Sequence, residues 1–269
     1  MSKRFGIALA LSGLVLLAGL VWQILRPHEP VYGGKHLSSW LEQYATNHFV
    51  RPRSAADKEA ETAIRQIGTN ALPVLLKLIA TKDSRLKQKL MARLPKAWVT
   101  WIYPRQADEY RSLGARGFVA LGPIAKPVVP ALMNLASDPD PRVRYLAIYA
   151  LGSLGSAAQP AIPLLIQRLN DADDGTRIDA MQGLVAIHLE PELVIPVFVK
   201  YVKDPDQGQS MRWRAVQGLG NFGGQAKQAV PILLPLLRSE DELLREAATN
   251  SLWKIDREAA AKAGVKVNW

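Results

Sequence analysis

Residues 140–165 of the chain read DPRVRYLAIYALGSLGSAAQPAIPLL and contain one complete helical hairpin. Asp140 followed by Pro141 is typical of a helix N-cap with proline at the first helical position. Large apolar residues follow at helical spacing, and we expect Gly155 to end the helix through a left-handed turn. Pro163 then opens a second helix, where its missing N–H costs nothing. This stretch therefore predicts two helices joined by a short turn.

The hairpin recurs along the chain. Five arginines, which we call the ladder arginines, follow one another at intervals of 33, 33, 35 and 33 residues. A proline stands 19 residues after four of them, and an aspartate stands four residues before three of them. The three columns are Arg111, Arg144, Arg177, Arg212 and Arg245; Pro130, Pro163, Pro196 and Pro231; and Asp140, Asp173 and Asp241. Such a period without a strand signal predicts an all-α fold, an α/α superhelix of about five hairpins without a sheet.

Small and large side chains keep fixed positions behind each ladder arginine. Residues three and six places later are glycine, alanine or serine, which lets two helices approach closely. Residues seven and ten places later are large and apolar, and their spacing puts them on one helical face. We assign this face to the core. The large pairs are Phe118/Leu121, Leu151/Leu154, Leu184/Ile187, Leu219/Phe222 and Leu252/Ile255.

The aspartates at the helix starts have a structural interpretation. A second aspartate column, Asp138, Asp171 and Asp204, ends the preceding helix. Aspartates at a helix start with an arginine one turn later favour the helix dipole, and we expect them to cross-link neighbouring repeats. The alternative is an acidic metal-binding edge. Calcium prefers denser clusters of carboxylates, so we expect no metal site.

The pattern resembles the HEAT repeat family, and more closely its short subclass related to the phycobilin-lyase repeats. The likeness covers residues 107–256 and is carried by Val143-Arg144, by Ala150-Leu151-Gly152 and by the segment 161–165 with its echoes in other repeats. It implies a superhelix whose concave side, lined by the second helices, faces a ligand. It implies no single activity, because this fold hosts many.

Residues 5–25, FGIALALSGLVLLAGLVWQIL, carry no charge and are long enough to span a bilayer. Lys3 and Arg4 precede this segment, which favours a cytoplasmic N-terminus. We therefore expect a single-pass protein of a bacterial inner membrane whose bulk lies outside the cytoplasm. The alternative is a cleaved signal peptide with secretion, but no small-x-small cleavage site follows Trp22 before Pro30.

Four regions follow from these patterns. Residues 1–27 form the anchor, residues 28–54 a linker and capping helix, residues 55–106 a degenerate first repeat with an insertion, and residues 107–269 the regular array. The sequence Val31-Tyr32-Gly33-Gly34-Lys35 is typical of a turn-rich linker, and Ser39 with Glu42 predicts a capping box for a short helix that holds Trp40, Leu41 and Tyr44. That helix would cover the apolar end of the array.

The net charge of +10 is uneven. Residues 107–269 contain 18 basic and 18 acidic side chains, whereas residues 27–106 contain 13 and 6. The excess therefore lies beside the membrane, where it fits attraction to anionic lipid or a solvated face. The insertion at residues 82–106 mixes this basic charge with Trp98, Trp101 and Tyr103. Such a mixture suits single-stranded nucleic acid, a lipid interface or aromatic packing, but an exported protein meets little nucleic acid, so we do not expect nucleic acid binding.

Catalytic patterns are scarce. The chain has no cysteine, and its four histidines have no second histidine at ligand spacing. One enzyme built from such repeats, deoxyhypusine hydroxylase, holds iron through several His-Glu pairs, and this chain has only His28-Glu29. None of the functional residues of the phycobilin lyases can be placed on it. His188 fits a turn position that other repeats give to glycine. We expect no enzymatic activity, no cofactor and no metal.

The second helices offer an exposed polar stripe, which we interpret as the partner-binding surface. It comprises Asn134, Gln167, Arg168, Lys200, Tyr201, Lys203 and Arg238. Arginine and tyrosine are favoured at interfaces, and the cationic part suits a protein or peptide with an acidic stretch. The sequence thus predicts a membrane-anchored scaffold. The alternative is a lyase-like enzyme or chromophore chaperone that uses the same groove.

Overall fold

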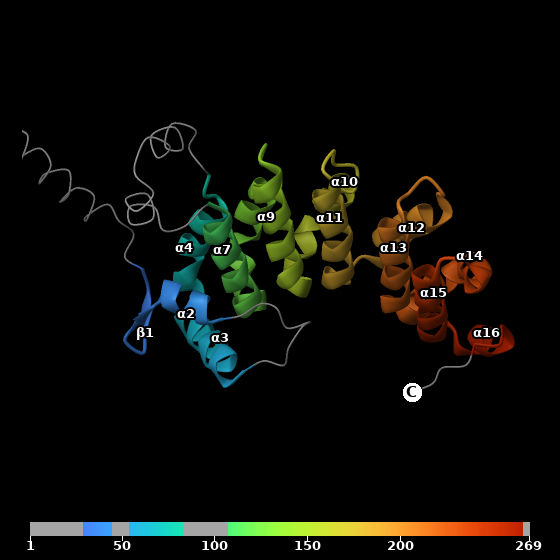
Figure 1. The fold of residues 1–269 in the computed structure, drawn as a ribbon, viewed down its shortest axis with the longest axis horizontal. Coiled ribbons are helices and arrows are strands. Elements are labelled where there is room, and N and C mark those ends of the chain that lie inside the picture. Colours follow the sequence, from blue (N-terminus) through green and yellow to red (C-terminus); the bar gives the residue numbers. More distant parts are fainter. Residues whose placement is uncertain (1–28, 45–53, 83–106, 266–269) are drawn as a thin grey trace, which may run out of the picture.

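A computed structural model describes residues 29–44, 54–82 and 107–265 of the chain. The predicted anchor at residues 5–25 and most of the insertion, residues 83–106, lie outside the described residues. Within the described part, helical hairpins stack into an elongated solenoid (Figure 1). The expected all-α superhelix is confirmed for this part, with one small exception at its N-terminal end.

The first helices of the hairpins form a continuous row (Figure 1). Each one contacts the next, from α7 through α9, α11 and α13 to α15. Contacts between successive second helices are fewer. The first helices are α3 (Ala55–Ile67), α7 (Ala107–Leu121), α9 (Pro141–Ser153), α11 (Asp174–Ile187), α13 (Gln209–Asn221) and α15 (Glu242–Ile255).

Each second helix runs back beside the first helix of its hairpin. They are α4 (Leu72–Ile79), α8 (Val129–Leu135), α10 (Ile162–Arg168), α12 (Pro191–Lys203) and α14 (Val230–Leu233), which continues into η5 (Leu234–Arg238). Short 3-10 segments connect most first and second helices: η1 (Gly68–Ala71), η2 (Gly122–Val128), η3 (Gly155–Ala161) and η4 (Gly223–Ala229). A last helix, α16 (Arg257–Lys262), packs against α15.

The turns follow the glycine and proline pattern in three of the regular hairpins. Gly122, Gly155 and Gly223 adopt left-handed φ angles of 53°, 57° and 53° within two residues of the end of a first helix. Proline stands at the second position of α8, α10 and α14, as predicted. His188 takes the glycine place after α11 with a φ of 53°, which confirms it as a turn residue.

The prediction that Pro196 opens a second helix is wrong. Pro191 opens α12, and Pro196 lies inside it on an exposed face. The reason is the connection after α11, where His188 and Glu190 are both left-handed and no 3-10 segment forms. The chain turns in three residues, so α12 begins early and contains the proline in its interior.

Small residues do allow close helix packing. A Cβ atom built on Gly117 would lie 2.3 Å from Leu75 Cδ2, and one on Gly218 would lie 2.3 Å from Phe198 Cε2. In both cases the glycine on a first helix receives the second helix of the preceding hairpin. Each glycine therefore makes room for a large core side chain that any larger residue would displace.

The N-terminal end departs from expectation in two places. Val31–Tyr32 (β1) and Lys35–His36 (β2) form a two-stranded antiparallel hairpin around two glycines, so the expectation of no sheet is wrong here. The capping box predicted for Ser39 and Glu42 is also wrong, because α2 (Leu37–Gln43) begins earlier. Glu29 serves instead, since its carboxylate accepts the Ser38 N–H at 2.6 Å.

Helix α2 covers the apolar end of the array. It buries Leu37, Trp40 and Leu41 against α3 and α7, and Tyr44 directly after it is also buried. Helix α3 begins with a capping box of its own, made by Ser54 and Asp57. The degenerate hairpin of α3 and α4 thus packs between the covering helix and the first regular repeat.

One helical run in the described part, Ala107–Leu135, is long and apolar enough to cross a membrane by length and composition. The left-handed Gly122 divides it into α7, η2 and α8. Phe118 and Leu121 of this run belong to the solenoid core. We therefore assign the run to a repeat hairpin.

Candidate binding surfaces

The ladder arginines bind the ends of the second helices. Arg144, Arg177 and Arg245 each donate a hydrogen bond to the carbonyl oxygen six residues earlier, at 3.0, 2.9 and 2.7 Å. Those carbonyls belong to the turn that ends the preceding second helix, where backbone acceptors have no partner inside the helix. A cation at this place also favours the negative end of the helix dipole.

Two ladder arginines, the first and the fourth, differ from this pattern. Arg111 is 1% exposed and donates to the Thr81 carbonyl at 2.7 Å. It also pairs with Asp108 at 2.5 Å and approaches Asp140 at 3.7 Å. Arg212 makes only a long contact from Nε to the Val202 carbonyl, at 3.4 Å. The arginine column is therefore engaged within the protein, with its weakest member in the fourth position.

The first aspartate column caps the first helices. Carboxylates of Asp140, Asp173 and Asp241 accept backbone N–H groups of α9, α11 and α15. The only ion pair that one of these three forms with a ladder arginine, among the described residues, is the 3.7 Å approach of Asp140 to Arg111. The expected cross-link between repeats is therefore largely absent from this column.

The second aspartate column makes the closer cross-links. Asp171 after α10 accepts from Arg144 of α9 in the same hairpin at 2.8 Å, and Asp138 accepts from Lys82 of the preceding hairpin at 2.8 Å. Burial opposes the charge of Asp171, but hydrogen bonds from the Asp173 N–H and from Arg144 keep the pKa of its carboxyl below the usual value. This carboxylate therefore remains ionised and stabilises its own hairpin.

The predicted stripe on the second helices is only partly available. Asn134, Gln167, Lys200, Lys203 and Arg238 are exposed. The three cations among them form no hydrogen bond or ion pair with any residue that the structure describes. The C-terminal half of the stripe therefore presents positive charge to the solvent.

Two stripe residues have structural partners, so their assignment to the partner-binding surface is corrected. Tyr201 is 7% exposed, and its hydroxyl donates to the Leu169 carbonyl of the preceding repeat at 2.9 Å. Arg168 is half-buried and pairs with Asp171 at 3.3 Å, while it also donates to Ser137 at 3.2 Å. Their side chains point to neighbouring turns because both lie at the packed junction between hairpins.

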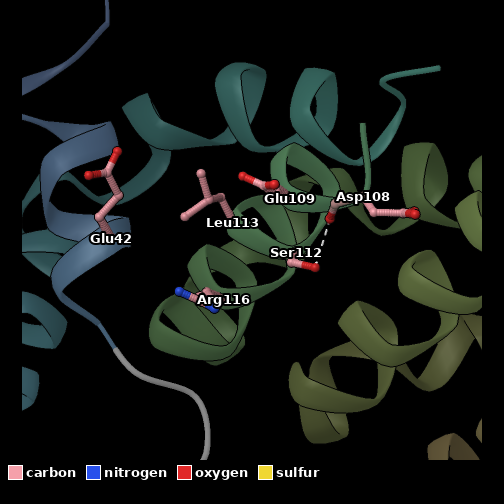
Figure 2. A pocket seen from close by; sticks show the side chains of 6 residues that line it. All are labelled: Glu42, Asp108, Glu109, Ser112, Leu113 and Arg116. Carbon is pink, nitrogen blue, oxygen red and sulfur yellow. Dashed lines mark hydrogen bonds between the residues drawn. The ribbon is translucent and has the colours of Figure 1, made fainter. Parts of the chain in front are cut away.

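A pocket of about 350 Å³ opens near the N-terminal end of the array (Figure 2). Glu42 reaches it from α2, and Asp108, Glu109, Ser112 and Arg116 reach it from α7. Asp108 already binds Arg111, and Arg142 at 2.6 Å. The acidic side of this pocket is thus partly occupied by the ladder. No group of three or more potential metal-ligating side chains occurs among the residues shown by the structure.

A second cleft lies between α9 and α11 and was not found from the sequence. Its volume is about 220 Å³, and its walls include Val119, Ile148, Tyr149, Asp179 and Ala186. Asp179 is 8% exposed and forms no hydrogen bond or ion pair within the described residues. The cleft thus combines an apolar wall with one buried carboxylate.

A signal for this cleft exists in the repeat alignment. The position two residues after each ladder arginine is Leu113, Leu146, Asp179, Arg214 and Ala247. Two charged residues therefore occupy a column that is otherwise apolar, in adjacent repeats. Charged residues are seldom buried without a partner, so this break in the column identifies an unusual place in the array.

The stacked hairpins and their row of first helices define a helical solenoid. The family model for HEAT repeats matches residues 108–185 and 195–263, which is more than half of the chain. The chain therefore belongs to the HEAT repeat family, as its resemblance predicted. No curated protein matches it in sequence.

Solved structures share this fold at low identity. Kap121p is 14% identical with a TM-score of 0.52, and the match covers 84% of this chain and 26% of that one. Kap121p bound to the extreme C-terminus of the phosphatase Cdc14p is 18% identical with a TM-score of 0.50, covering 83% and 26%. An archaeal HEAT-like repeats protein from Thermococcus onnurineus NA1 is 19% identical with a TM-score of 0.42, covering 90% and 85%. This chain thus spans about a quarter of Kap121p, and these similarities show the fold alone.

Proposed function

We propose that the protein is a helical repeat scaffold that binds a protein or peptide partner. The observation that carries this proposal is the exposed cationic part of the stripe, Lys200, Lys203 and Arg238, in a molecule whose ladder arginines are engaged internally. Unpaired cations on consecutive repeats favour a partner with an acidic stretch, because complementary charge steers encounter and sets register. We take the second helices to line the concave side.

The solved relatives support a partner of this kind. One of them is the karyopherin Kap121p bound to the extreme C-terminus of the protein phosphatase Cdc14p. A repeat array offers an extended surface along which a peptide can contact several hairpins in turn. We extend this mode of binding to the present chain, without a catalytic activity of its own.

The membrane part of the proposal rests on residues 5–25. Their length and lack of charge fit a single-pass anchor in a bacterial inner membrane, with the array outside the cytoplasm. Alkaline phosphatase fused after Trp269 should then be active in a bacterial host, because its disulfides form only outside the cytoplasm. A fusion that is inactive, together with an active cytosolic reporter at the same position, contradicts this orientation.

Crosslinking in native membranes followed by mass spectrometry tests the scaffold. Lys200→Glu with Lys203→Glu should reduce partner capture in a salt-dependent way and leave the thermal melt nearly unchanged, because both side chains are exposed. The matched control is Lys126→Glu with Lys227→Glu, which makes the same charge change on exposed turns. Asn134→Ala at the neutral end should also have little effect.

Two results would contradict the proposal. Full retention of every crosslinked partner by the double charge reversal on α12 excludes the cationic stripe as the docking surface. An equal loss of partner capture in the control pair would show that the effect comes from the net charge of the protein and not from the stripe. A coloured cofactor on the purified protein would instead favour the lyase-like or chromophore-chaperone alternative.

A further inference from the structure

The cleft between α9 and α11 contains a buried acid without a partner. Asp179 is 8% exposed and lines the cleft together with Tyr149. Buried polar groups in folded proteins are nearly always hydrogen-bonded, and a buried carboxylate without a partner is costly. The hairpin pattern does not require an acid here, since three other repeats place leucine or alanine at this position and the fourth places Arg214.

The surrounding charges do not satisfy Asp179. Burial raises the pKa of Asp179 to about 7, Arg214 of α13 opposes that shift, and Asp173 at the start of α11 adds to it. Arg214 forms no ion pair with this carboxylate and lies over the Trp213 ring at 5.2 Å. Tyr145 and Tyr149 of α9 are close enough for the Asp179 charge to raise the pKa of each phenol, after the effect of burial. The acid therefore lies near two phenols and one cation, and it is bonded to none of them.

We propose that this cleft binds the ammonium group of a lysine side chain presented by a protein partner. The Asp179 carboxylate would accept the ammonium group, and the Tyr149 ring at the rim would face the cation, an arrangement that is favourable for aromatic faces. Val119, Ile148 and Ala186 provide an apolar wall for the methylene groups of the side chain. The proposal rests on the scaffold function only in assigning the lysine to a partner.

The size and shape of the cleft fit one side chain. Its volume of about 220 Å³ is below the roughly 300–1,000 Å³ that small-molecule ligand pockets occupy. Gly152 and Gly183 also line the cleft and approach each other closely, since a Cβ on Gly152 would lie 3.2 Å from the Gly183 Cα. The Asp179 carboxylate could accept either cation, but the compact ammonium group of lysine needs less room in such a cleft than the broad planar guanidinium of arginine.

A peptide titration tests the proposal on the full-length protein in lipid nanodiscs. The probe is acetyl-Gly-Gly-Lys-Gly-Gly-amide, and the readout is the ¹³Cγ resonance of Asp179 in protein labelled at aspartate. The lysine peptide should shift this resonance saturably and lower the pKa of Asp179. Because protons compete with the ammonium group, affinity should fall by up to tenfold per pH unit below about pH 7.

Peptide controls define the ligand. Peptides with norleucine or Nε-acetyl-lysine in place of lysine should give no saturable shift, since neither carries the charge. An arginine peptide that binds as tightly as the lysine peptide overturns the assignment to lysine. The absence of a saturable shift at peptide concentrations on the order of 10 mM overturns the site itself.

Variants separate binding from folding. Asp179→Asn should weaken lysine-peptide binding at least tenfold. Because this variant lacks the Asp179 resonance, its binding is measured through the resonances of Tyr149. The control Glu192→Gln removes one exposed acid and should leave binding unchanged. Tyr149→Phe keeps the ring and should bind, and Tyr149→Leu should not. Equal binding by Tyr149→Leu and wild type contradicts the proposal even if Asp179→Asn fails to fold. The charge reversals at Lys200 and Lys203 on α12 should reduce partner capture and leave this peptide titration unchanged. The scaffold proposal and the lysine-site proposal can therefore fail independently.

Discussion

Two junctions between first helices, α9 with α11 and α13 with α15, use the same glycine column and differ in what they bury. Gly152 meets Gly183 in the first junction, and Gly220 meets Ser251 in the second. In the second, the Ser251 hydroxyl donates to the Val216 carbonyl at 2.8 Å, which closes the contact. In the first, Asp179 is buried and unpartnered where the second has Ala247. The same repeat thus makes one junction that a hydrogen bond stabilises and one that an unpartnered, buried carboxylate destabilises.

The largest expected effect is at the closed junction. Gly220→Ala would place its Cβ 2.5 Å from Ser251 Oγ and 2.9 Å from the Ser251 Cα, so the backbone itself must move. We expect a loss of about 3 kcal/mol in the free energy of unfolding. Gly152→Ala at the open junction meets its neighbour at 3.2 Å and should cost less than about 1 kcal/mol. Urea unfolding of both variants checks this order, and equal losses would remove the distinction.

The arginines at the two junctions should differ next. Arg144 donates to two backbone carbonyls and pairs with Asp171 at 2.8 Å, while Arg212 makes one contact at 3.4 Å. Arg144→Ala should lower the free energy of unfolding by about 2 kcal/mol, because it removes the bonds to two backbone carbonyls and the closest ion pair of Asp171. Arg212→Ala should cost about 0.5 kcal/mol. A larger loss for Arg212→Ala in thermal melts contradicts this comparison.

Asp179→Asn should stabilise the open junction. The pKa of this acid is about 7 in the folded protein and near 3.8 when unfolded, so the native state binds the extra proton between these values. Stability from this group is therefore present below about pH 4 and is lost as pH rises toward 7. Asparagine removes the cost of burying an ionised carboxylate. We therefore expect the free energy of unfolding to rise by about 1–2 kcal/mol at pH 8 and to change little at pH 4. A loss of stability at pH 8 would show that Asp179 holds the fold together.

Ser251→Ala tests the hydrogen bond that closes the second junction. It removes one buried hydrogen bond to the Val216 carbonyl and should cost about 1 kcal/mol. Combining Ser251→Ala with Gly220→Ala tests whether these two residues interact. If the clash of Gly220→Ala is with Ser251, the double variant should cost less than the sum of the two single changes. Additive losses in the same denaturation series would place the strain elsewhere.

The repeat itself was predictable because each hairpin encodes its own ends. Glycine after the first helix and proline at the start of the second set the turns of three hairpins, and the large columns at helical spacing define the core. Prediction failed where a distant or unusual contact replaced a local one. Glu29 caps α2 from outside the helix, and the left-handed Glu190 moves the start of α12 ahead of Pro196.

The site was less predictable than the fold. Periodicity places Tyr201 and Lys200 side by side on α12, yet one is buried and hydrogen-bonded to the preceding repeat and the other is exposed. A neighbouring turn one period away decides that difference. The charged residues Asp179 and Arg214 break an apolar column of the repeat alignment, but only the packing of α9 against α11 shows that Asp179 lines a cleft.

The sequence by itself determined the period, the two helices of each hairpin, their glycine and proline turns and membership of the HEAT repeat family, because these depend on side-chain spacing within one repeat. Only the tertiary structure decided which polar groups are engaged. The ladder arginines bind carbonyls at the ends of preceding helices, Tyr201 binds Leu169, and Asp179 has no hydrogen-bond or ion-pair partner among the described residues. Hydrogen bonds form within about 3 Å, and the stacking of repeats, rather than the order of residues, sets distances on that scale.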